Sequence, residues 1–190
     1  MAAADELERT LDSVDPFWDE DAGPIFPSEA MRLLEGVRDV EHALLGVATD
    51  AQQPLARRFA AVEALFQGGW TSWRSGPEGA AIAGVMAQAI PADGIHNRWG
   101  LPGHYVGRSG KDLLSIQDGV EEALLPLLDD QKLLTISGGE TATVAHSAGY
   151  RVADLAGYLL AERRGEPFGE DWDPAARDRI LERLRGTPPA

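Results

Sequence analysis

The stretch GKDLLSIQDGVEEALLPLLDD, residues 110–130, decides the fold class of this chain. It places an Asp-Gly pair, Asp118 and Gly119, between two segments whose apolar residues recur at spacings of three and four. That spacing is the period of an α-helix, and Asp-Gly is typical of a tight turn. Two more helical segments follow at 150–165 and 173–186. The succession of helices predicts stacked helical pairs and favours a binding surface over a catalytic site.

The segments before this stretch carry the same period. Residues 28–48 and 54–67 place apolar side chains along one helical face, and residues 77–90 form a segment rich in alanine and glycine. Small residues allow close approach, so we expect this third segment to be packed on several sides. The sequence therefore predicts an all-α fold built from antiparallel helix pairs.

The ends of the chain differ from this helical body. Residues 1–27 are acidic and interrupted by prolines, which predicts an N-terminal arm held to the body by Phe17, Trp18 and Phe26. Residues 28–186 are expected to form a single helical domain, followed by a short tail at 187–190.

One segment departs from the helical pattern. Around Gly138 and Gly139, the flanking runs LLTIS and TATVA are rich in β-branched residues, and the glycines supply the positive φ of a tight turn. A small β-hairpin inserted near residues 133–146 is therefore predicted.

The C-terminal segments resemble a known repeat family. An apolar helix ends at the acidic pair Asp129 and Asp130, and the next helix opens with Arg151 and Val152 followed by small residues. This pattern is similar to HEAT-like repeats, and in particular to those of bacterial proteins related to phycobilisome lyases. The resemblance covers mainly residues 109–186. It implies an α-solenoid that acts as a scaffold or adaptor, and it does not imply attachment of a bilin.

Composition excludes several functions. The chain has 17 basic and 31 acidic residues, a net charge of −14, and no cysteine. An acidic protein is repelled by phosphate backbones and anionic lipids, so we expect no nucleic-acid and no membrane partner. Thiolate chemistry is excluded as well. No apolar run approaches the length of a membrane span and no signal peptide is visible, so a cytoplasmic location is expected.

The Gly-rich loop at residues 95–105 and the turn at 137–140 form the predicted contact surface. Binding hot spots are rich in Trp, Tyr and Arg. Trp99 and Tyr105 are therefore the predicted apolar anchors, with Asn97, Arg98 and Glu140 as polar and orienting groups. The alternative is that Trp99 and Leu101 fill a gap in the core beneath the loop.

Three functions remain open from the sequence. The leading one is a non-catalytic protein-binding module, an adaptor or accessory subunit of a larger complex, with another protein as partner and no cofactor. The second is a metal-assisted hydrolase or oxygenase that uses His96, His104, His146 and Glu140, although their spacing matches no strong metal motif. The third is an acidic neutraliser of a basic toxin or enzyme.

Overall fold

The protein is mostly helical, as predicted, and it contains one very small antiparallel sheet. The computed structural model describes residues 2–17, 24–169 and 173–186. The elements in these ranges are α1 (Ala2–Asp12), α2 (Ser28–Glu35), α3 (Val40–Thr49), α4 (Leu55–Gln67), α5 (Gly76–Ala92), the 3-10 helix η1 (His96–Arg98), β1 (Gly100–Leu101), β2 (Tyr105–Val106), α6 (Arg108–Leu114), α7 (Val120–Leu124), the 3-10 helix η2 (Leu125–Asp129), α8 (Gly139–Ala148), α9 (Val152–Arg164) and α10 (Pro174–Gly186).

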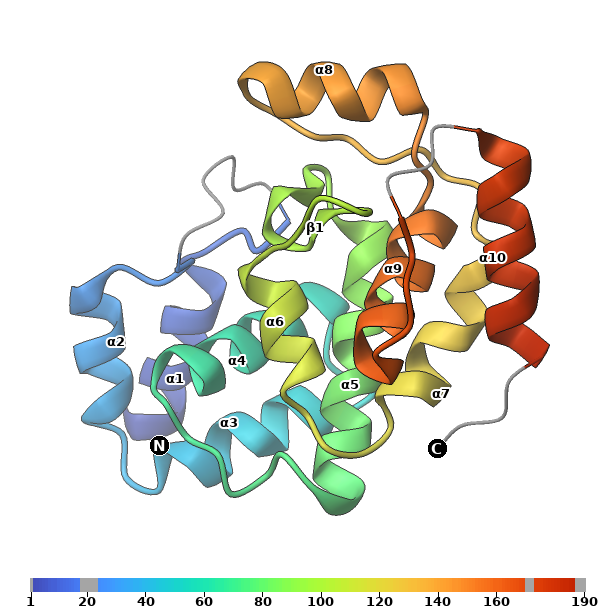
Figure 1. The fold of residues 1–190 in the computed structure, drawn as a ribbon. Coiled ribbons are helices and arrows are strands. Elements are labelled where there is room, and N and C mark those ends of the chain that lie inside the picture. Colours follow the sequence, from blue (N-terminus) through green and yellow to red (C-terminus); the bar gives the residue numbers. More distant parts are fainter. Residues whose placement is uncertain (1, 18–23, 170–172, 187–190) are drawn as a thin grey trace.

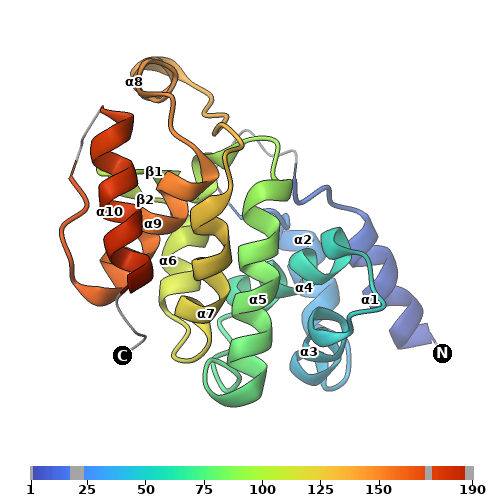
Figure 2. The same cartoon turned by 90° about the vertical axis from the view of Figure 1, so that its right-hand side faces the viewer.

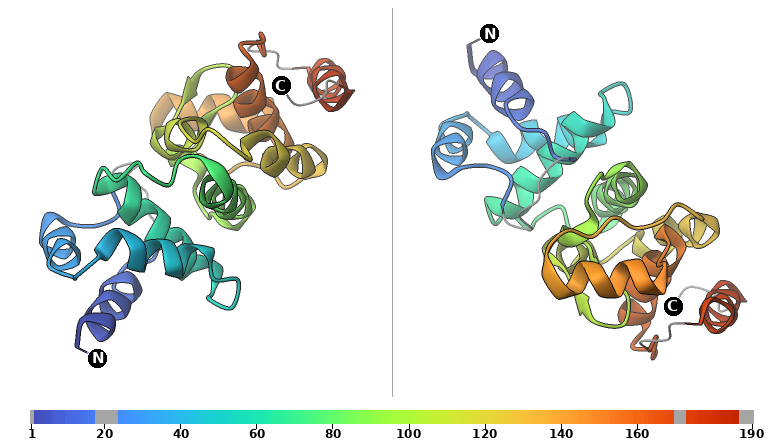
Figure 3. Two further views of the ribbon diagram at one scale, coloured as in Figure 1. Left: turned by 90° about the horizontal axis from the view of Figure 1, so that it is seen from below. Right: turned by 90° about the horizontal axis from the view of Figure 1, so that it is seen from above.

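The helices pack largely in chain order (Figures 1 and 2). Helix α1 contacts α2 and α4, α3 contacts α4 and α5, and α5 contacts α7. Helices α7 and η2 then contact α9, which contacts α10. Figure 3 shows α5 in the middle, with α1 to α4 on one side of it and the later helices on the other. One continuous set of buried apolar side chains runs through both sides.

Small residues let neighbouring segments approach α5, as the sequence predicts. The turn between α6 and α7 places Gly119 at φ +79°, and a Cβ atom there would lie 2.5 Å from the Cα atom of Ala80 in α5. Only glycine fits this position, both for its backbone angle and for the space available. The predicted Asp-Gly turn is therefore confirmed, and it fixes the distance between α5 and α7.

The helix predicted over residues 28–48 is two helices. Helix α2 ends at Glu35, the chain passes through Gly36, and α3 begins after Asp39, which has a left-handed backbone with φ 52°. Glycine lowers helix stability and aspartate tolerates the left-handed region, which explains the break. Most of the predicted apolar face remains inside, with Leu34 and Leu44 fully buried, but Leu33 is exposed.

The small sheet does not lie where the sequence predicted it. Residues 139–148 form α8, and the antiparallel strands are β1 and β2 in the Gly-rich loop, with Leu101 paired to Tyr105. Residues 133–136 form no strand, and Leu133 makes an isolated bridge with Arg151. The β-branched residues of TATVA are outweighed by Ala145 and Ala148, which are buried three residues apart on one helical face.

The N-terminal arm is held to the body by two of the predicted aromatic residues. Phe17 stacks on Phe59 of α4 with ring centroids 5.7 Å apart. Phe26 is buried, and its backbone exchanges two hydrogen bonds with the side-chain amide of Gln67. Trp18 lies outside the described residues.

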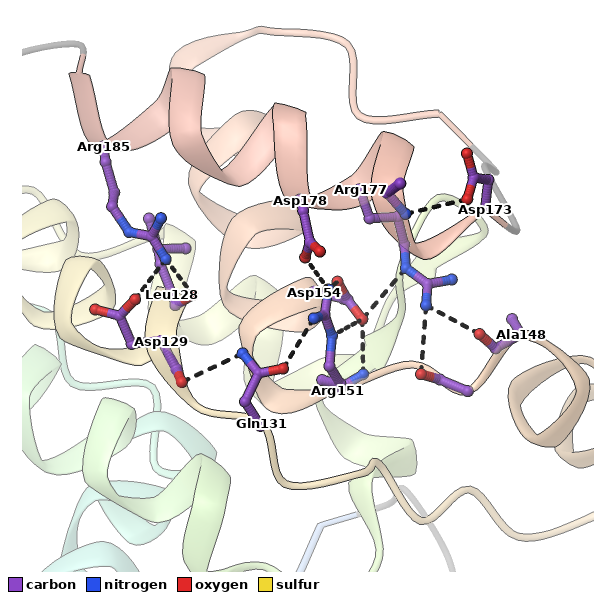
Figure 4. Close-up of polar contacts among 12 residues, drawn as sticks. Leu128, Asp129, Gln131, Ala148, Arg151, Asp154, Asp173, Arg177, Asp178 and Arg185 are labelled. Atoms are coloured by element: carbon purple, nitrogen blue, oxygen red, sulfur yellow. Dashed lines mark hydrogen bonds and ion pairs between the residues drawn. The ribbon is translucent and has the colours of Figure 1, made fainter.

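A network of charged side chains attaches α10 to α9 (Figure 4). Asp154 is fully buried and lies between two arginines, Arg151 at 2.8 Å and Arg177 at 3.4 Å. Arg177 is itself buried, donates a hydrogen bond to the carbonyl of Ala148 and lies over the ring of Tyr150. Because a buried charge requires partners, this network fixes the position of α10.

None of the helices in the described part of the chain combines the length and the apolar character required to cross a membrane.

Candidate functional site

The Gly-rich loop after α5 is built on a buried polar base, formed by the side chains of Asp93, Arg98 and Trp99. Asp93 accepts a hydrogen bond from the indole nitrogen of Trp99 at 2.9 Å and pairs with Arg98 at 3.6 Å. Burial raises the pKa of Asp93 to about 6, and the hydrogen bonds from Ile95 and Trp99 and the charge of Arg98 oppose this rise. The loop is thus rigid at its root, where the side chains point inward.

Two of the five predicted contact residues belong to this base. Trp99 is 0% exposed and stacks on Phe59 with ring centroids 5.6 Å apart, while Arg98 is 1% exposed. Neither side chain can reach a partner, so their predicted roles as anchor and orienting charge are wrong. The alternative interpretation, in which Trp99 and Leu101 fill the core, is correct for both residues.

The next residues tie the loop to the segment before α8. The backbone N–H of His96 donates to the carbonyl of Thr135 at 2.7 Å, and His96 Nδ1 lies 3.1 Å from the N–H of Thr135. Asn97 makes a matching pair of hydrogen bonds, donating to the carbonyl of Ser137 and accepting from its N–H, each at 2.9 Å. Asn97 is therefore a positioning residue that joins the two predicted surface segments.

This junction brings the β1–β2 hairpin beside the first turns of α8 and leaves a pocket between them. The pocket has a volume of about 280 Å³. It contains the predicted contact residues Tyr105 and Glu140, from segments that are 35 positions apart in the chain. Its lining residues are Leu101, His104, Tyr105, Glu140, Thr141 and Val144.

The lining combines an apolar surface with unpartnered polar groups. Leu101 and Val144 supply aliphatic carbon. Tyr105 is 37% exposed, and partial burial raises the pKa of its phenol, which stays neutral at physiological pH. Glu140 is exposed, and its carboxylate makes no ion pair or hydrogen bond with any residue that the structure describes. Apolar walls with a few convergent polar groups are typical of binding pockets.

Helix α8, which forms one wall of the pocket, lies apart from the other helices at the top of the view in Figure 1. Its buried side chains Ala145 and Ala148 pack in a small cluster with Leu101, Ile136 and Tyr150, separate from the main core. The helix begins after Gly138 and ends before Gly149, and both glycines have positive φ. No side chain caps its amino end. Helix α8 is therefore held by few contacts and is bounded at each end by a glycine with positive φ.

The three histidines of the predicted metal site do not come together. His96 is fully buried, and burial lowers its pKa to about 4, so its imidazole is neutral and serves the loop junction. His146 is exposed on α8, with Nδ1 3.0 Å from the carbonyl of Ala142. Only His104 lies in the pocket with Glu140. Within residues 2–17, 24–169 and 173–186, no group of three or more His, Asp or Glu side chains could hold a metal ion.

The sequence missed two residues of the pocket. Thr141 and Val144 were assigned to a strand, where they would point to opposite faces, but in α8 they are three residues apart and share one face. The spacing of Ala142, Ala145 and Ala148 was the available signal, because small residues every three positions indicate a packed helical face.

No protein-family model, curated protein or solved structure matches this chain. The assignment of function therefore rests on the chemistry of the site itself.

Proposed function

We propose that this protein is a cytoplasmic, non-catalytic binding module that holds a segment of a partner protein in the pocket between the β1–β2 hairpin and α8. The observation that carries the proposal is the meeting of Tyr105 and Glu140 across this pocket, over the aliphatic wall of Leu101 and Val144. The exposed ring of Tyr105 and the free carboxylate of Glu140 are not needed to hold the fold together. In interfaces, such rings supply contact area at low entropic cost.

The rigidity of the loop supports the same role. The hydrogen bonds of Asn97 and the buried ion pair of Asp93 fix the hairpin before any partner arrives. A binding surface that is already ordered loses less entropy on association. The HEAT-like resemblance of residues 109–186 stays a prediction; it agrees with an adaptor role and adds no contact residue to the pocket.

Photo-crosslinking tests the proposal directly. Benzoylphenylalanine is introduced at position 105, in the pocket, and in a second variant at position 33, where Leu33 is 48% exposed on α2. Both variants are irradiated in source cells. We expect one crosslinked product of defined mass from position 105 and none of that mass from position 33.

Competition provides the control. An excess of the unaltered protein should abolish the product, whereas an excess of the Tyr105→Ala variant should not. This substitution lies at the surface and is expected to change stability by only about 0.5 kcal/mol. The same products from both positions, or no product from position 105, would contradict the proposal.

A further inference from the structure

Many basic side chains of this protein form contacts within the molecule, whereas many carboxylates remain unpaired on its surface. Of the 17 basic residues 15 are arginine, and many of these serve internal contacts. The ion pairs Arg57–Asp12, Arg164–Glu121 and Arg185–Asp129 have N–O distances of 2.7, 2.6 and 2.6 Å. The carboxylates that remain outside such pairs give the surface its net negative charge, which attracts cationic partners.

In a second cavity, the acidic side chains Asp118 and Glu121 have partners within the protein. It is lined by residues 117–122 and Arg163, and has a volume of about 100 Å³. Its acidic residue Glu121 is paired with Arg164, and Asp118 accepts a hydrogen bond from the N–H of Gly76 at 2.6 Å. Arg163 donates to the carbonyls of Leu114 and Ile116 beside it. Asp118, Glu121 and Arg163 therefore serve the fold, whereas Glu122 in the same lining is exposed and makes no contact with the described residues.

The pocket beside α8 differs in that no arginine stands beside its carboxylate in the lining. No lysine or arginine lines it, its one histidine is His104, and the carboxylate of Glu140 is free of contacts with the described residues. The amino end of α8 carries the positive end of the helix dipole, and Glu140 in the first turn offsets it. An anionic ligand would meet this carboxylate, so the pocket suits a cation.

We propose that the pocket receives a lysine or arginine side chain from an exposed segment of the partner protein. The aliphatic part of such a side chain fits against Leu101 and Val144, since long basic side chains cover apolar surface with their methylene groups. Its charged end then meets the carboxylate of Glu140 and the ring of Tyr105, whose negative face attracts cations. The inference rests on the proposed function, for which it names the chemistry of the partner.

Short peptides test the inference with the full-length protein. The probes are blocked pentapeptides, acetyl-Ala-Ala-X-Ala-Ala-amide, in which X is Arg, Lys, norleucine or Glu. Binding is followed by ¹⁵N–¹H NMR titration, which detects dissociation constants on the order of 1 mM. We expect the Arg and Lys peptides to shift amide signals of residues 101–106 and 139–145. The norleucine peptide has the same aliphatic part without the charge and should not bind.

Two carboxylate variants separate the pocket from the general surface charge. Glu140→Gln should weaken binding of the Arg peptide about tenfold, as expected for loss of a charge-assisted hydrogen bond. The matched control, Glu122→Gln, removes an exposed charge at the second cavity and should leave the affinity unchanged. Tyr105→Leu keeps the apolar volume but loses the ring, and it should weaken binding as well.

The inference would be overturned by unchanged affinity in Glu140→Gln or by preferential binding of the Glu peptide. It would also be overturned by signal shifts spread over the acidic surface that leave out the pocket. The crosslink at position 105 reports a partner whatever its chemistry. A crosslinked partner without binding of the basic peptides would therefore overturn this inference alone, whereas a missing crosslink would overturn the proposed function.

Discussion

Asp93 and His96 are buried three positions apart, and burial moves their pKa values in opposite directions. The pKa of Asp93 rises from 3.8 to about 6, and the pKa of His96 falls from 6.5 to about 4. The folded protein binds the Asp93 proton more tightly than the unfolded chain, so this contribution to stability is lost as pH rises from about 4 to 6. The His96 contribution is lost as pH falls from 6.5 to about 4. Each pKa shift corresponds to about 3 kcal/mol of folding free energy. Because the two contributions change with pH in opposite directions, they largely cancel.

Single variants should expose this cancellation. In His96→Gln, glutamine can still accept a hydrogen bond, and stability relative to the unaltered protein should fall as pH rises from 4 to 6.5. In Asp93→Asn, it should instead rise over that range. Urea denaturation at intervals of half a pH unit measures both curves. Curves parallel to that of the unaltered protein would show that these two groups do not titrate as the structure indicates.

At the scale of single residues, residue types predicted which two segments meet but not the direction of each side chain. Tyr105 and Glu140 were predicted to share a surface, and they line one pocket. Arg98 and Trp99 were predicted to join them, but they point into the core. Trp and Arg are common both in hot spots and in buried polar networks. The Asp93 carboxylate that holds both residues inside is separated from them by five and six positions, and no local pattern reveals the pairing.

Among the elements, α8 is the one that should open independently. Its buried side chains belong to a small cluster outside the main core, and glycines with positive φ bound it at both ends. The neighbouring α9 is buried along nearly its whole length. Local opening occurs at lower free energy where few apolar contacts hold a segment. Hydrogen exchange followed by mass spectrometry should show residues 139–148 exchanging well before residues 152–164. Equal protection of the two helices would contradict this prediction.

Elements with a strong helical period were predictable from the sequence. Helices α4, α9 and α10 lie within or nearly match the predicted segments, because their apolar residues are spaced for one buried face. The predictions failed at α8, whose β-branched residues favoured a strand, and at several short features. The break at Asp39 depends on one backbone angle, and the strands β1 and β2 are two residues each, too short for alternation to be visible. Their pairing comes from the turn and from the buried base beneath it.

The molecule as a whole should unfold in one step. The main core is a single set of buried side chains that extends from Leu7 in α1 to Leu184 in α10. Neither half can separate without exposing apolar surface along α5. Far-UV circular dichroism reports the helices, and the fluorescence of the tryptophans, including the buried Trp73 and Trp99, reports the packing. The two urea transitions should coincide. A helical signal that persists after the fluorescence change would show that the halves fold separately.

The separate cluster beneath α8 has a consequence for how this protein can change over evolutionary time. Substitutions at the pocket-lining positions of α8, Glu140, Thr141 or Val144, alter the pocket without touching the main core. Under the proposed function, recognition and stability therefore depend on largely different residues. If the proposed partner is recognised there, a change of partner needs substitutions in this one helix and leaves the residues of the main core unchanged.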